Sequence, residues 1–217
     1  MPIGPNENTP SRNRLKEKVA IVTGAGSIGD GWGNGKAAAY VYAKEGAKTF
    51  CVDFRLEAAE ETVKQIEDIG GKAVAYSADV TDEVDVNAMV SACMETWGRV
   101  DILHNNVGGQ GVGRSLDNIT VDDWNATFTR NVTSAMLTCK AVMPIMEKQQ
   151  DGSIINISSI AALRHLNSNT AVYSSTKGAM IEFTKNIAIQ HASSGVRANC
   201  VCPGYICLLY TSDAADE

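Results

Sequence analysis

Three residues in the C-terminal third of the chain have types and spacing suited to proton transfer. Tyr173 and Lys177 are four residues apart, and Ser159 precedes the tyrosine by 14 residues. A tyrosine phenol titrates near pH ~10, too high for efficient proton transfer at neutral pH. Residues four apart share one face of a helix, and a nearby ammonium favours the phenolate. The three residues therefore predict a site at which a tyrosine carries a proton.

The same tyrosine–lysine spacing occurs at Tyr40 and Lys44, so the pair alone is weak evidence. We interpret Tyr40 and Lys44 as surface residues in contact with solvent. Tyr173 differs in its context, because Ser159 directly follows an apolar stretch typical of a buried strand. A long helical pattern then contains both Tyr173 and Lys177.

A glycine-rich segment near the N-terminus, between a predicted strand and a predicted helix, indicates a nucleotide site. Its candidate binding residues are Gly24, Ser27, Gly33, Asn34 and Gly35. Glycines permit positive φ and a close approach of the backbone to a pyrophosphate. The start of the helix adds unpaired amides and a partial positive charge. A flexible glycine linker is the alternative for the glycines alone. Combined with a proton-carrying tyrosine, the segment predicts hydride transfer between a nicotinamide and an alcohol or ketone.

Two acidic positions follow the second and third predicted strands. A carboxylate at Asp53 would accept hydrogen bonds from the adenosine ribose and repel a 2′-phosphate, which favours NAD over NADP. Arg55 would offset part of that repulsion, so NADP stays the less favoured alternative. Asp79 and Val80 are placed to meet the adenine, although an acid such as Asp79 is also typical of a helix start.

Short apolar runs alternate with helical patterns along the chain. The predicted strands are Val19–Thr23, Lys48–Asp53, Lys72–Asp79, Asp101–Asn106, Ser153–Ser158 and Val196–Cys202. The predicted helices are Gly35–Glu45, Glu57–Ile69, Val84–Trp97, Val121–Glu147 with a break near Asn131 or Pro144, and Ala171–Ala192. This alternation is typical of an α/β fold with a doubly wound parallel sheet of the Rossmann kind. The candidate residues follow strand ends, so we expect them to converge along one edge of the sheet.

Composition limits the remaining classes of function. The chain has 217 residues, 44% apolar and 20% charged, and a net charge of −6 that argues against a nucleic-acid partner. Without an 18-residue apolar run or a secretory signal, we expect a cytoplasmic protein with no membrane partner. The six cysteines lack a Cys-x-x-Cys pair and the three histidines are scattered. We therefore expect free thiols and no metal site.

Both ends of the chain are expected to lie outside the folded domain, 17–206. Residues 1–16 are polar and rich in proline, which is typical of a disordered extension. Residues 207–217 read CLLYTSDAADE, which is what a transposase-type sequencing adapter gives when translated. We therefore predict a non-native tail and a truncated domain that ends at Ile206. A genuine acidic C-terminal tail is the alternative.

From Lys18 to Ile206 the chain resembles the short-chain dehydrogenase/reductase family, the kind with a single Rossmann domain. The glycine motif of that family matches Thr23, Gly24, Gly33 and Gly35 if residues 28–32 are an insertion. Further matches to family motifs are Asn105-Asn106-Val107-Gly108, Asn131, Ser159, Tyr173, Lys177, Pro203-Gly204 and, near the nicotinamide, Ile206. The chain departs from the family at the insertion and at Val107. The threonine expected after Gly204, the substrate lid and the seventh strand are missing.

The resemblance implies roles for four catalytic residues. Tyr173 exchanges the proton of the substrate hydroxyl, Ser159 rather than Ser158 holds the same oxygen, and Asn131 holds a water. Lys177 favours the phenolate, and Tyr173 and Lys177 also contact the nicotinamide ribose, while Asn106 lies along the cofactor.

The resemblance also implies a small alcohol or ketone as substrate and a homo-oligomer, dimer or tetramer. Substrate contacts are expected from Gly109–Asp117 and Ile160–Thr170. The polar candidates there are Arg114, Arg164 and His165.

Two other functional interpretations stay open at this point. In the first, the chain is a non-catalytic nucleotide-binding regulator on the same fold. In the second, it is an inactive fragment of the enzyme. The complete set of four catalytic candidates argues against a regulator. A missing last strand would leave Val196–Cys202 as an exposed edge, which favours aggregation of the fragment.

Overall fold

The computed structural model describes residues 5, 10–27, 29, 31–113, 115–165 and 169–204. Three predictions therefore lie outside the described residues: Ile206 near the nicotinamide, Arg114 in a substrate segment and the tail 207–217. The described chain forms two compact units, which divide between Ala78 and Asp79.

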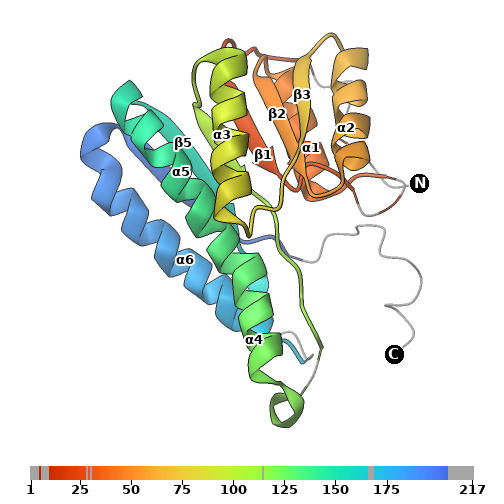
Figure 1. Ribbon diagram of the computed structural model, residues 1–217, viewed down its shortest axis with the longest axis vertical. Coiled ribbons are helices and arrows are strands. Elements are labelled where there is room, and N and C mark those ends of the chain that lie inside the picture. Colours follow the sequence, from red (N-terminus) through yellow and green to blue (C-terminus); the bar gives the residue numbers. More distant parts are fainter. Residues whose placement is uncertain are drawn as a thin grey trace. The chain divides into compact units, whose positions relative to one another are not determined.

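The first unit is a three-stranded parallel sheet with two helices (Figure 1). Its elements are β1 (Val19–Thr23), α1 (Asn34–Lys44), β2 (Lys48–Asp53), α2 (Leu56–Asp68) and β3 (Lys72–Ser77). The strand order is β3-β2-β1, with Val19 opposite Lys48 and Lys48 opposite Lys72. Helices α1 and α2 form the two crossover connections that three successive parallel strands require.

Burial explains the apolar runs of the first unit. All five residues of β1 are buried, and Phe50, Cys51 and Val52 of β2 are at most 1% exposed. Helices α1 and α2 contribute Ala39, Tyr40, Ala43, Ala59 and Ile66 to the same core. Strands covered in this way read as continuous apolar runs rather than as alternating ones.

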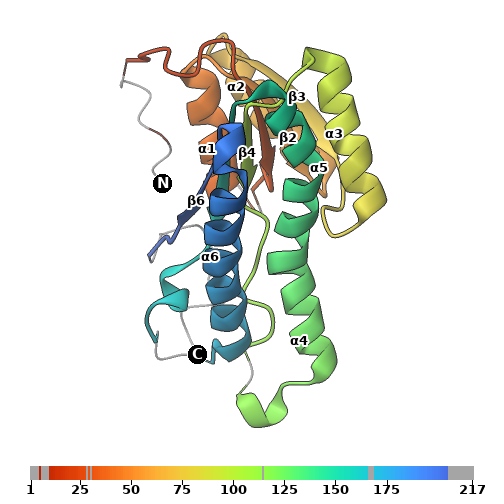
Figure 2. The same ribbon diagram turned by 90° about the vertical axis from the view of Figure 1, so that its left-hand side faces the viewer.

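The second unit continues the same alternation with three more strands. Its elements are α3 (Glu83–Trp97), β4 (Ile102–Asn105), α4 (Val121–Phe128), α5 (Ser134–Gln149), β5 (Gly152–Ile157), α6 (Ala171–His191) and β6 (Val196–Val201), with short 3-10 turns at Leu116–Asn118, Ile160–Ala162 and Ala192–Ser194. Strands β4, β5 and β6 are parallel in that order. Helices α5 and α6 run alongside each other in both ribbon views (Figures 1 and 2).

The predicted long helix is interrupted at one of the two expected positions. Helices α4 and α5 are joined by a π-helical turn, Thr129–Thr133, with Asn131 inside it. Pro144 lies within α5 and does not end that helix. A π turn inserts one extra residue into a helix and is frequent at functional sites. The turn places the buried Asn131 toward the interior of the unit.

Two parts of the first unit differ from what the sequence suggested. Tyr40 is 3% exposed and packs edge-to-face on Trp32, with ring centroids 5.1 Å apart. The expectation that Tyr40 contacts solvent is therefore wrong, because Tyr40 lies on the core face of α1. Within the predicted N-terminal extension, Leu15 N donates to Glu45 O at 2.8 Å, and Arg14 pairs with the Glu45 carboxylate at 3.1 Å.

Helix lengths and side-chain clusters of the described residues bear on membrane and metal partners. None of the helices that the structure describes is both long and apolar enough to cross a membrane. Among the same residues, no cluster of three histidine, cysteine or acidic side chains is suited to a metal ion. The five cysteines in the described part of the chain are free thiols, and Cys51, Cys93 and Cys139 are buried.

Burial of His104 in β4 makes the stability of the fold depend on pH. The side chain is 6% exposed, and burial lowers the pKa of His104 from 6.5 to about 4. Between these two values the unfolded chain binds a proton that the folded chain does not. The free energy of unfolding therefore falls as the pH falls from 6.5 to 4.

We expect His104→Gln to reduce this acid sensitivity. Between pH 7.5 and pH 5, titration of His104 should lower the free energy of unfolding of the wild type by about 2 kcal/mol. The variant should not show this loss. Thermal or urea unfolding of both proteins at the two pH values measures the difference. An equal loss of stability in both proteins would assign the acid sensitivity to other groups.

Candidate functional site

The glycine turn of the first unit follows β1 and is held by backbone contacts. Gly24 has a φ of 63°, in the left-handed region that favours glycine. The next amide, Ala25 N, donates to Val52 O at 2.9 Å. At Gly26 a Cβ would come 2.5 Å from the Cβ of Ala58 and 2.8 Å from an Asp53 carboxylate oxygen. Only glycine fits there, so the turn runs directly against α2 and the end of β2.

The N-terminus of α1 has the features of an anion-binding helix end. Gly33 is the N-cap residue, no side chain caps its amides, and the first turn contains no acidic residue. The amide groups of a first helical turn lack partners inside the helix and carry a partial positive charge. Gly33 and Asn34 are half-buried and Gly35 is buried, so the turn is partly covered yet not sealed.

Asp53 at the end of β2 is oriented by two backbone amides. Gly26 N donates to Oδ2 at 2.9 Å and Arg55 N donates to Oδ1 at 3.1 Å. Each carboxylate oxygen keeps lone pairs that can accept from ribose hydroxyls. The Arg55 guanidinium donates to Ser27 O at 2.6 Å. Arg55 therefore joins the glycine turn to the start of α2, of which it is the N-cap residue.

Asp79 opens the second unit in a turn of its own. Its Oδ1 accepts from Thr81 N at 2.9 Å and from Thr81 Oγ1 at 2.7 Å. The N-cap of α3 is Asp82, whose side chain accepts from Val84 N and Asp85 N. Val80 is only 4% exposed. Asp79 thus has the bonding expected of an acid at a helix start, and its contact with adenine remains a prediction.

Asn131 is the most fully buried of the candidate catalytic side chains. Its Nδ2 donates to Gly109 O and to Thr176 Oγ1, both at 2.9 Å, and its Oδ1 accepts from Gly109 N at 2.8 Å. Both amide protons are therefore used, and one lone pair of Oδ1 remains. These bonds tie the loop after β4 to α6.

Lys177 is buried close to Tyr173 and bonded to the backbone of β5. The side chain is 3% exposed, and Nζ donates to Ile157 O at 2.8 Å. Burial lowers the pKa of Lys177 from 10.5 to about 8. Its Nζ lies 5.7 Å from the ring centroid of the half-buried Tyr173. The ammonium is thus poorly hydrated and lies near the tyrosine ring.

Gly108 shows how closely Asn131 and Lys177 approach the loop after β4. A Cβ at Gly108 would lie 3.0 Å from Asn131 Oδ1 and 3.0 Å from Lys177 Nζ. A side chain there would displace one of the two polar groups. The glycine of the Asn105–Gly108 motif therefore leaves room for the site. Asn106, in the same loop, is half-buried directly after β4.

The two neighbouring serines after β5 have different bonding. Ser158 is 3% exposed, and its hydroxyl donates to Lys177 O at 2.7 Å. Ser159 is half-buried, and its Oγ accepts from Ala161 N at 3.1 Å. Ser159 therefore caps its own loop and still has its hydroxyl proton to donate. The adjacent Ile160 N donates to Pro203 O at 2.9 Å, which joins this loop to the Pro203-Gly204 turn.

Two polar groups behind the site were missed by the sequence analysis. Thr176 Oγ1 accepts from Asn131 and donates to Tyr173 O at 2.7 Å, so it connects the two candidates. Asn105 Nδ2 donates to Asn156 Oδ1 at 2.9 Å across β4 and β5. The position of Thr176 between Tyr173 and Lys177 was a possible signal. No local pattern pointed to Asn156.

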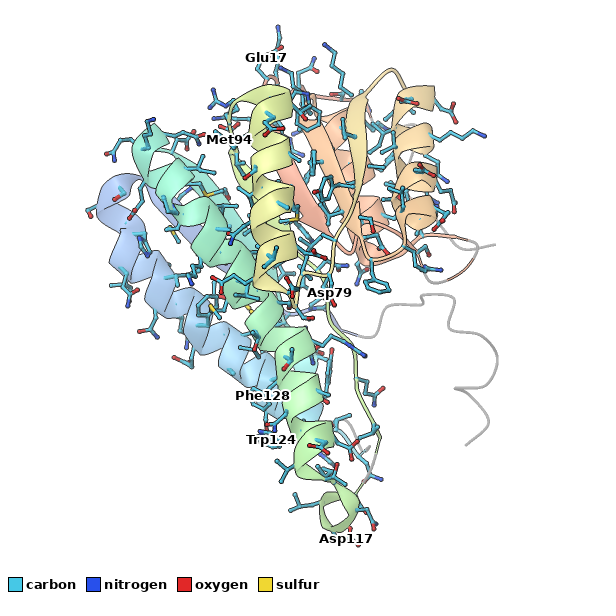
Figure 3. The ribbon with its side chains drawn as sticks, in the orientation of Figure 1. Glu17, Asp79, Met94, Asp117, Trp124 and Phe128 are labelled. Carbon is cyan, nitrogen blue, oxygen red and sulfur yellow. The ribbon has the colours of Figure 1, made fainter. Side chains whose placement is uncertain are left out.

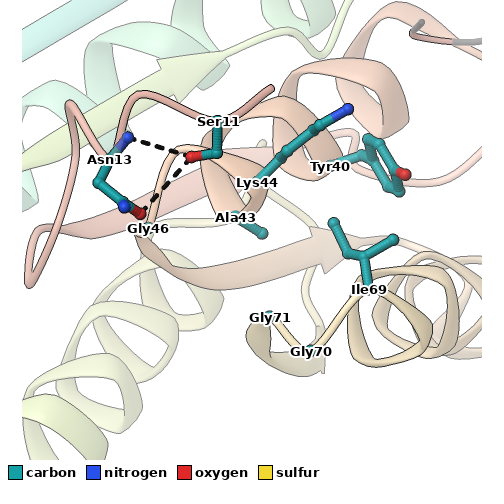
Figure 4. A pocket seen from close by; sticks show the side chains of 9 residues that line it. All are labelled: Ser11, Asn13, Tyr40, Ala43, Lys44, Gly46, Ile69, Gly70 and Gly71. Carbon is teal, nitrogen blue, oxygen red and sulfur yellow. Dashed lines mark hydrogen bonds between the residues drawn. The ribbon is translucent and has the colours of Figure 1, made fainter. Parts of the chain in front are cut away.

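A hollow of about 470 Å³ in the first unit is separate from the glycine turn. Its lining includes Tyr40, Lys44, Ile69 and the Gly70–Gly71 turn after α2, as Figure 4 shows. These residues surround the C-terminal end of α1, whereas a pyrophosphate would bind at the N-terminal end. The hollow is therefore not the nucleotide site.

Comparisons with known proteins agree with the arrangement in each unit. The profile described as short chain dehydrogenase matches residues 18–213. The 2-(R)-hydroxypropyl-CoM dehydrogenase of Xanthobacter autotrophicus is 39% identical over 192 residues, which cover 87% of this chain and 74% of that protein.

Solved structures give the same result. A short-chain dehydrogenase/reductase from Burkholderia xenovorans is 39% identical, with a TM-score of 0.86 over 89% of this chain and 76% of that one. An NAD+-bound xylitol dehydrogenase is 35% identical, with a TM-score of 0.82 over 88% of this chain and 72% of that one.

The chain therefore belongs to the short-chain dehydrogenase family, and it is an oxidoreductase with a Rossmann nucleotide-binding fold. The predicted doubly wound parallel sheet of six strands is confirmed. Members of this family bind NAD(H) or NADP(H) and act on small molecules. The family match extends past Ile206, so the non-native tail and the domain end at Ile206 remain predictions.

The low pKa of Lys177 predicts a specific pH dependence of stability. From pH 8 to 10.5, Lys177 keeps its proton in the unfolded chain but has lost it in the folded protein. The contribution of Lys177 to the free energy of unfolding therefore rises with pH in this range. Burial raises the pKa of the Cys51, Cys93 and Cys139 thiols to about 12, and they act in the opposite sense above pH 9. A comparison with Lys177→Met removes their common effect.

We expect the unfolding free energy of the wild type to rise relative to Lys177→Met by about 2 kcal/mol from pH 8 to pH 10. Urea unfolding of both proteins at the two pH values measures the change. A constant difference between them would show that Lys177 does not titrate in this range.

Proposed function

We propose that the chain transfers a hydride between NAD(H) and the carbinol or carbonyl carbon of a small alcohol or ketone, with Tyr173 as general acid and base. The observation that carries this proposal is the buried Lys177 Nζ, 5.7 Å from the Tyr173 ring. A non-catalytic nucleotide-binding protein has no use for a desolvated ammonium beside a phenol. When bound, the nicotinamide ring supplies or accepts the hydride.

In the oxidising direction, Tyr173 as phenolate takes the proton of the substrate hydroxyl. Lys177 favours this phenolate because an ammonium in a poorly hydrated position acts more strongly than one in water. Ser159 donates its hydroxyl proton to the same substrate oxygen and fixes its position. In the reducing direction Tyr173 returns the proton to the oxygen of the carbonyl group.

Asn131 and Thr176 maintain the geometry around this proton transfer. The remaining lone pair of Asn131 Oδ1 is suited to accept from a water that exchanges the proton with solvent. Thr176 contributes indirectly, since it bonds both Asn131 Nδ2 and the main-chain oxygen of Tyr173. Asn131 therefore has a structural role, because it accepts a hydrogen bond from Gly109 N, in addition to its proposed role in the proton path.

The residues of the first unit fit a dinucleotide. The close backbone approach at Gly26 leaves no space for a side chain, and the uncapped amides of α1 are suited to a pyrophosphate. Gly24, Ser27, Gly33, Asn34 and Gly35 would hold the phosphates, and Asp53 the adenosine ribose. The proposed cofactor-binding residues of the second unit are Asp79, Val80, Asn106, Tyr173, Lys177, Pro203 and Gly204.

Asp53 supports NAD as the preferred cofactor. Its carboxylate is held in place by two amides and would repel a 2′-phosphate. Arg55 is engaged with Ser27 O, so accepting NADP would require this guanidinium to change its partner.

The substrate class rests on the relatives and on two loop residues. The names of the similar proteins refer to a hydroxypropyl group and to xylitol, which are both hydroxylated compounds. Arg164 and His165 are exposed after the Ser159 loop. We propose a small polar alcohol or the corresponding ketone, with Arg164 or His165 contacting its polar groups.

A homo-oligomer is also proposed, on the basis of exposed apolar residues on α4 and α5. Val121 is 74% and Trp124 40% exposed, and Met136 is 37% exposed. Trp124 and Phe128 stack on each other along α4, at 4.8 Å between ring centroids (Figure 3). Burying such side chains against a second copy would stabilise a dimer.

Replacement of the phenol tests the proposed general acid and base. Tyr173→Phe should lower kcat by about 10² to 10⁴, because the ring remains and only the proton carrier is lost. NADH binding, measured by calorimetry, should be retained with an affinity loss of less than about tenfold, because the phenol makes only one of the proposed contacts with the cofactor. The rate of NADH formation is measured with the best substrate from a panel of secondary alcohols. Tyr76→Phe, which removes a hydroxyl from β3 in the first unit, is the matched control.

An undiminished rate in Tyr173→Phe would remove Tyr173 from the mechanism. NAD binding without turnover on any alcohol or ketone in the panel would instead favour the non-catalytic interpretation.

A change of charge at Asp53 tests the cofactor preference. Asp53→Asn keeps an oxygen to accept from Gly26 N but loses the negative charge. We expect the ratio of kcat/KM for NAD to that for NADP to fall by about tenfold or more, since a charged hydrogen bond is lost and a repulsion removed. Steady-state kinetics with both cofactors measure the ratio. An unchanged ratio would show that Asp53 does not face the ribose.

A further inference from the structure

Helix α2 contacts the predicted phosphate-binding segment at two successive residues. Thr62 Oγ1 donates to Ala25 O at 2.8 Å, in the glycine turn after β1. Glu61 Oε1 accepts from Lys36 Nζ at 2.5 Å, in the first turn of α1. The two ends of the segment are thus fixed to the same helix, although Glu61 and Lys36 are 25 residues apart in sequence.

The Lys36 side chain is buried in an aromatic environment. Lys36 is 1% exposed, and its Nζ lies 5.6 Å from the ring centroid of Trp32. An ammonium over an indole face is attracted by the ring. The same indole packs edge-to-face on Tyr40, at 5.1 Å and an interplanar angle of 77°. Trp32 is therefore held from two directions by residues of α1.

Trp32 is the last residue of the insertion in the glycine motif, and Gly33 after it is the N-cap of α1. A Cβ on Gly33 would lie 3.2 Å from Gly26 O, so the helix start packs against the glycine turn. A shift of Trp32 would move Gly33 and with it the uncapped amides of the first helical turn. The position of Trp32 therefore determines where these amides point.

We propose that Trp32, Lys36 and Glu61 are positioning residues for the dinucleotide, fixing the start of α1 so that its first amides meet the pyrophosphate. This inference rests on the proposed nucleotide site. None of the three side chains touches the cofactor in this proposal.

The charges of this group suggest a role beyond stability. The Lys36 side chain is 2% exposed and that of Glu61 is 55% exposed, so only the lysine is fully desolvated. Such a pair adds little net stability, whereas removing one partner leaves a buried charge. Replacing both partners together by uncharged residues should therefore leave a folded protein. In that protein the first turn of α1 has lost its attachment to α2.

Binding of ADP-ribose tests the proposal without requiring turnover. The variants are Lys36→Met with Glu61→Gln, the conservative Lys36→Arg, and a control in which the exposed pair Lys185–Glu182 on α6 is changed to Met and Gln. Calorimetry should give about tenfold weaker ADP-ribose binding for the first double variant, about 1.4 kcal/mol of binding free energy. Lys36→Arg should stay within about threefold of the wild type, and the control within about twofold.

Two further measurements separate positioning from a general loss of structure. With a substrate in hand, KM for NAD should rise about tenfold while kcat at saturating NAD changes by less than about twofold. In a Trp97→Phe, Trp124→Phe background, Trp32 is the remaining tryptophan and its fluorescence reports on the segment directly. Its emission should shift to longer wavelength in the Lys36→Met, Glu61→Gln variant, because the indole loses the ammonium that holds it and becomes more exposed to water.

The binding measurements distinguish a failure of the proposed function from a failure of the positioning role. A wild type that binds neither ADP-ribose nor NAD would overturn the proposed function itself. Wild-type binding with unchanged affinity in the Lys36→Met, Glu61→Gln variant would overturn only the positioning role. A lower melting temperature with unchanged ADP-ribose affinity would likewise assign the pair to stability and overturn this inference.

Discussion

The desolvated ammonium of Lys177 is the interaction on which the second unit depends. A lysine that is 3% exposed must find polar partners inside the protein, and Lys177 finds Ile157 O at the end of β5. That bond joins α6 to the sheet at the place where Ser158 also donates to Lys177 O. Burial lowers the pKa of Lys177 to about 8, so the charge is retained at neutral pH only at some cost. Buried charges with shifted pKa values cluster at functional sites, which supports the role proposed for Lys177 beside Tyr173.

The first unit depends on backbone proximity in the same way. Gly26 lies so close to Ala58 and Asp53 that a side chain would separate the glycine turn from α2. Because of this proximity, the Gly26 amide donates to Asp53 and holds its carboxylate in place. The same carboxylate is proposed to select the cofactor. One close contact thus links the shape of the glycine turn to the carboxylate that is proposed to select NAD over NADP. A larger residue at position 26 would disturb both at once.

The sequence predicted the order and type of the elements well, because continuous apolar runs such as Val19–Thr23 are typical of covered parallel strands. The break near Asn131 was also predicted, and the π turn there is its structural form. Contacts between distant segments were not predictable. No local sequence pattern predicts the pairing of Lys36 with Glu61. Tyr40 was wrongly predicted to contact solvent, because the spacing of Tyr40 and Lys44 does not indicate which face of α1 is covered. The bonding of Asp53 to Gly26 likewise depends on the approach of two loops.

The bonding of Asn131 explains why a π turn is used in the second unit. A regular α-helix would place this side chain one residue out of phase, away from Gly109 and Thr176. The extra residue turns the amide inward, where both of its protons are satisfied by Gly109 O and Thr176 Oγ1. A buried amide with satisfied donors holds its orientation, so the last lone pair of Oδ1 has a fixed direction. Since Thr176 also bonds Tyr173 O, the irregular turn and the first turn of α6 form one connected polar network around the proposed proton path.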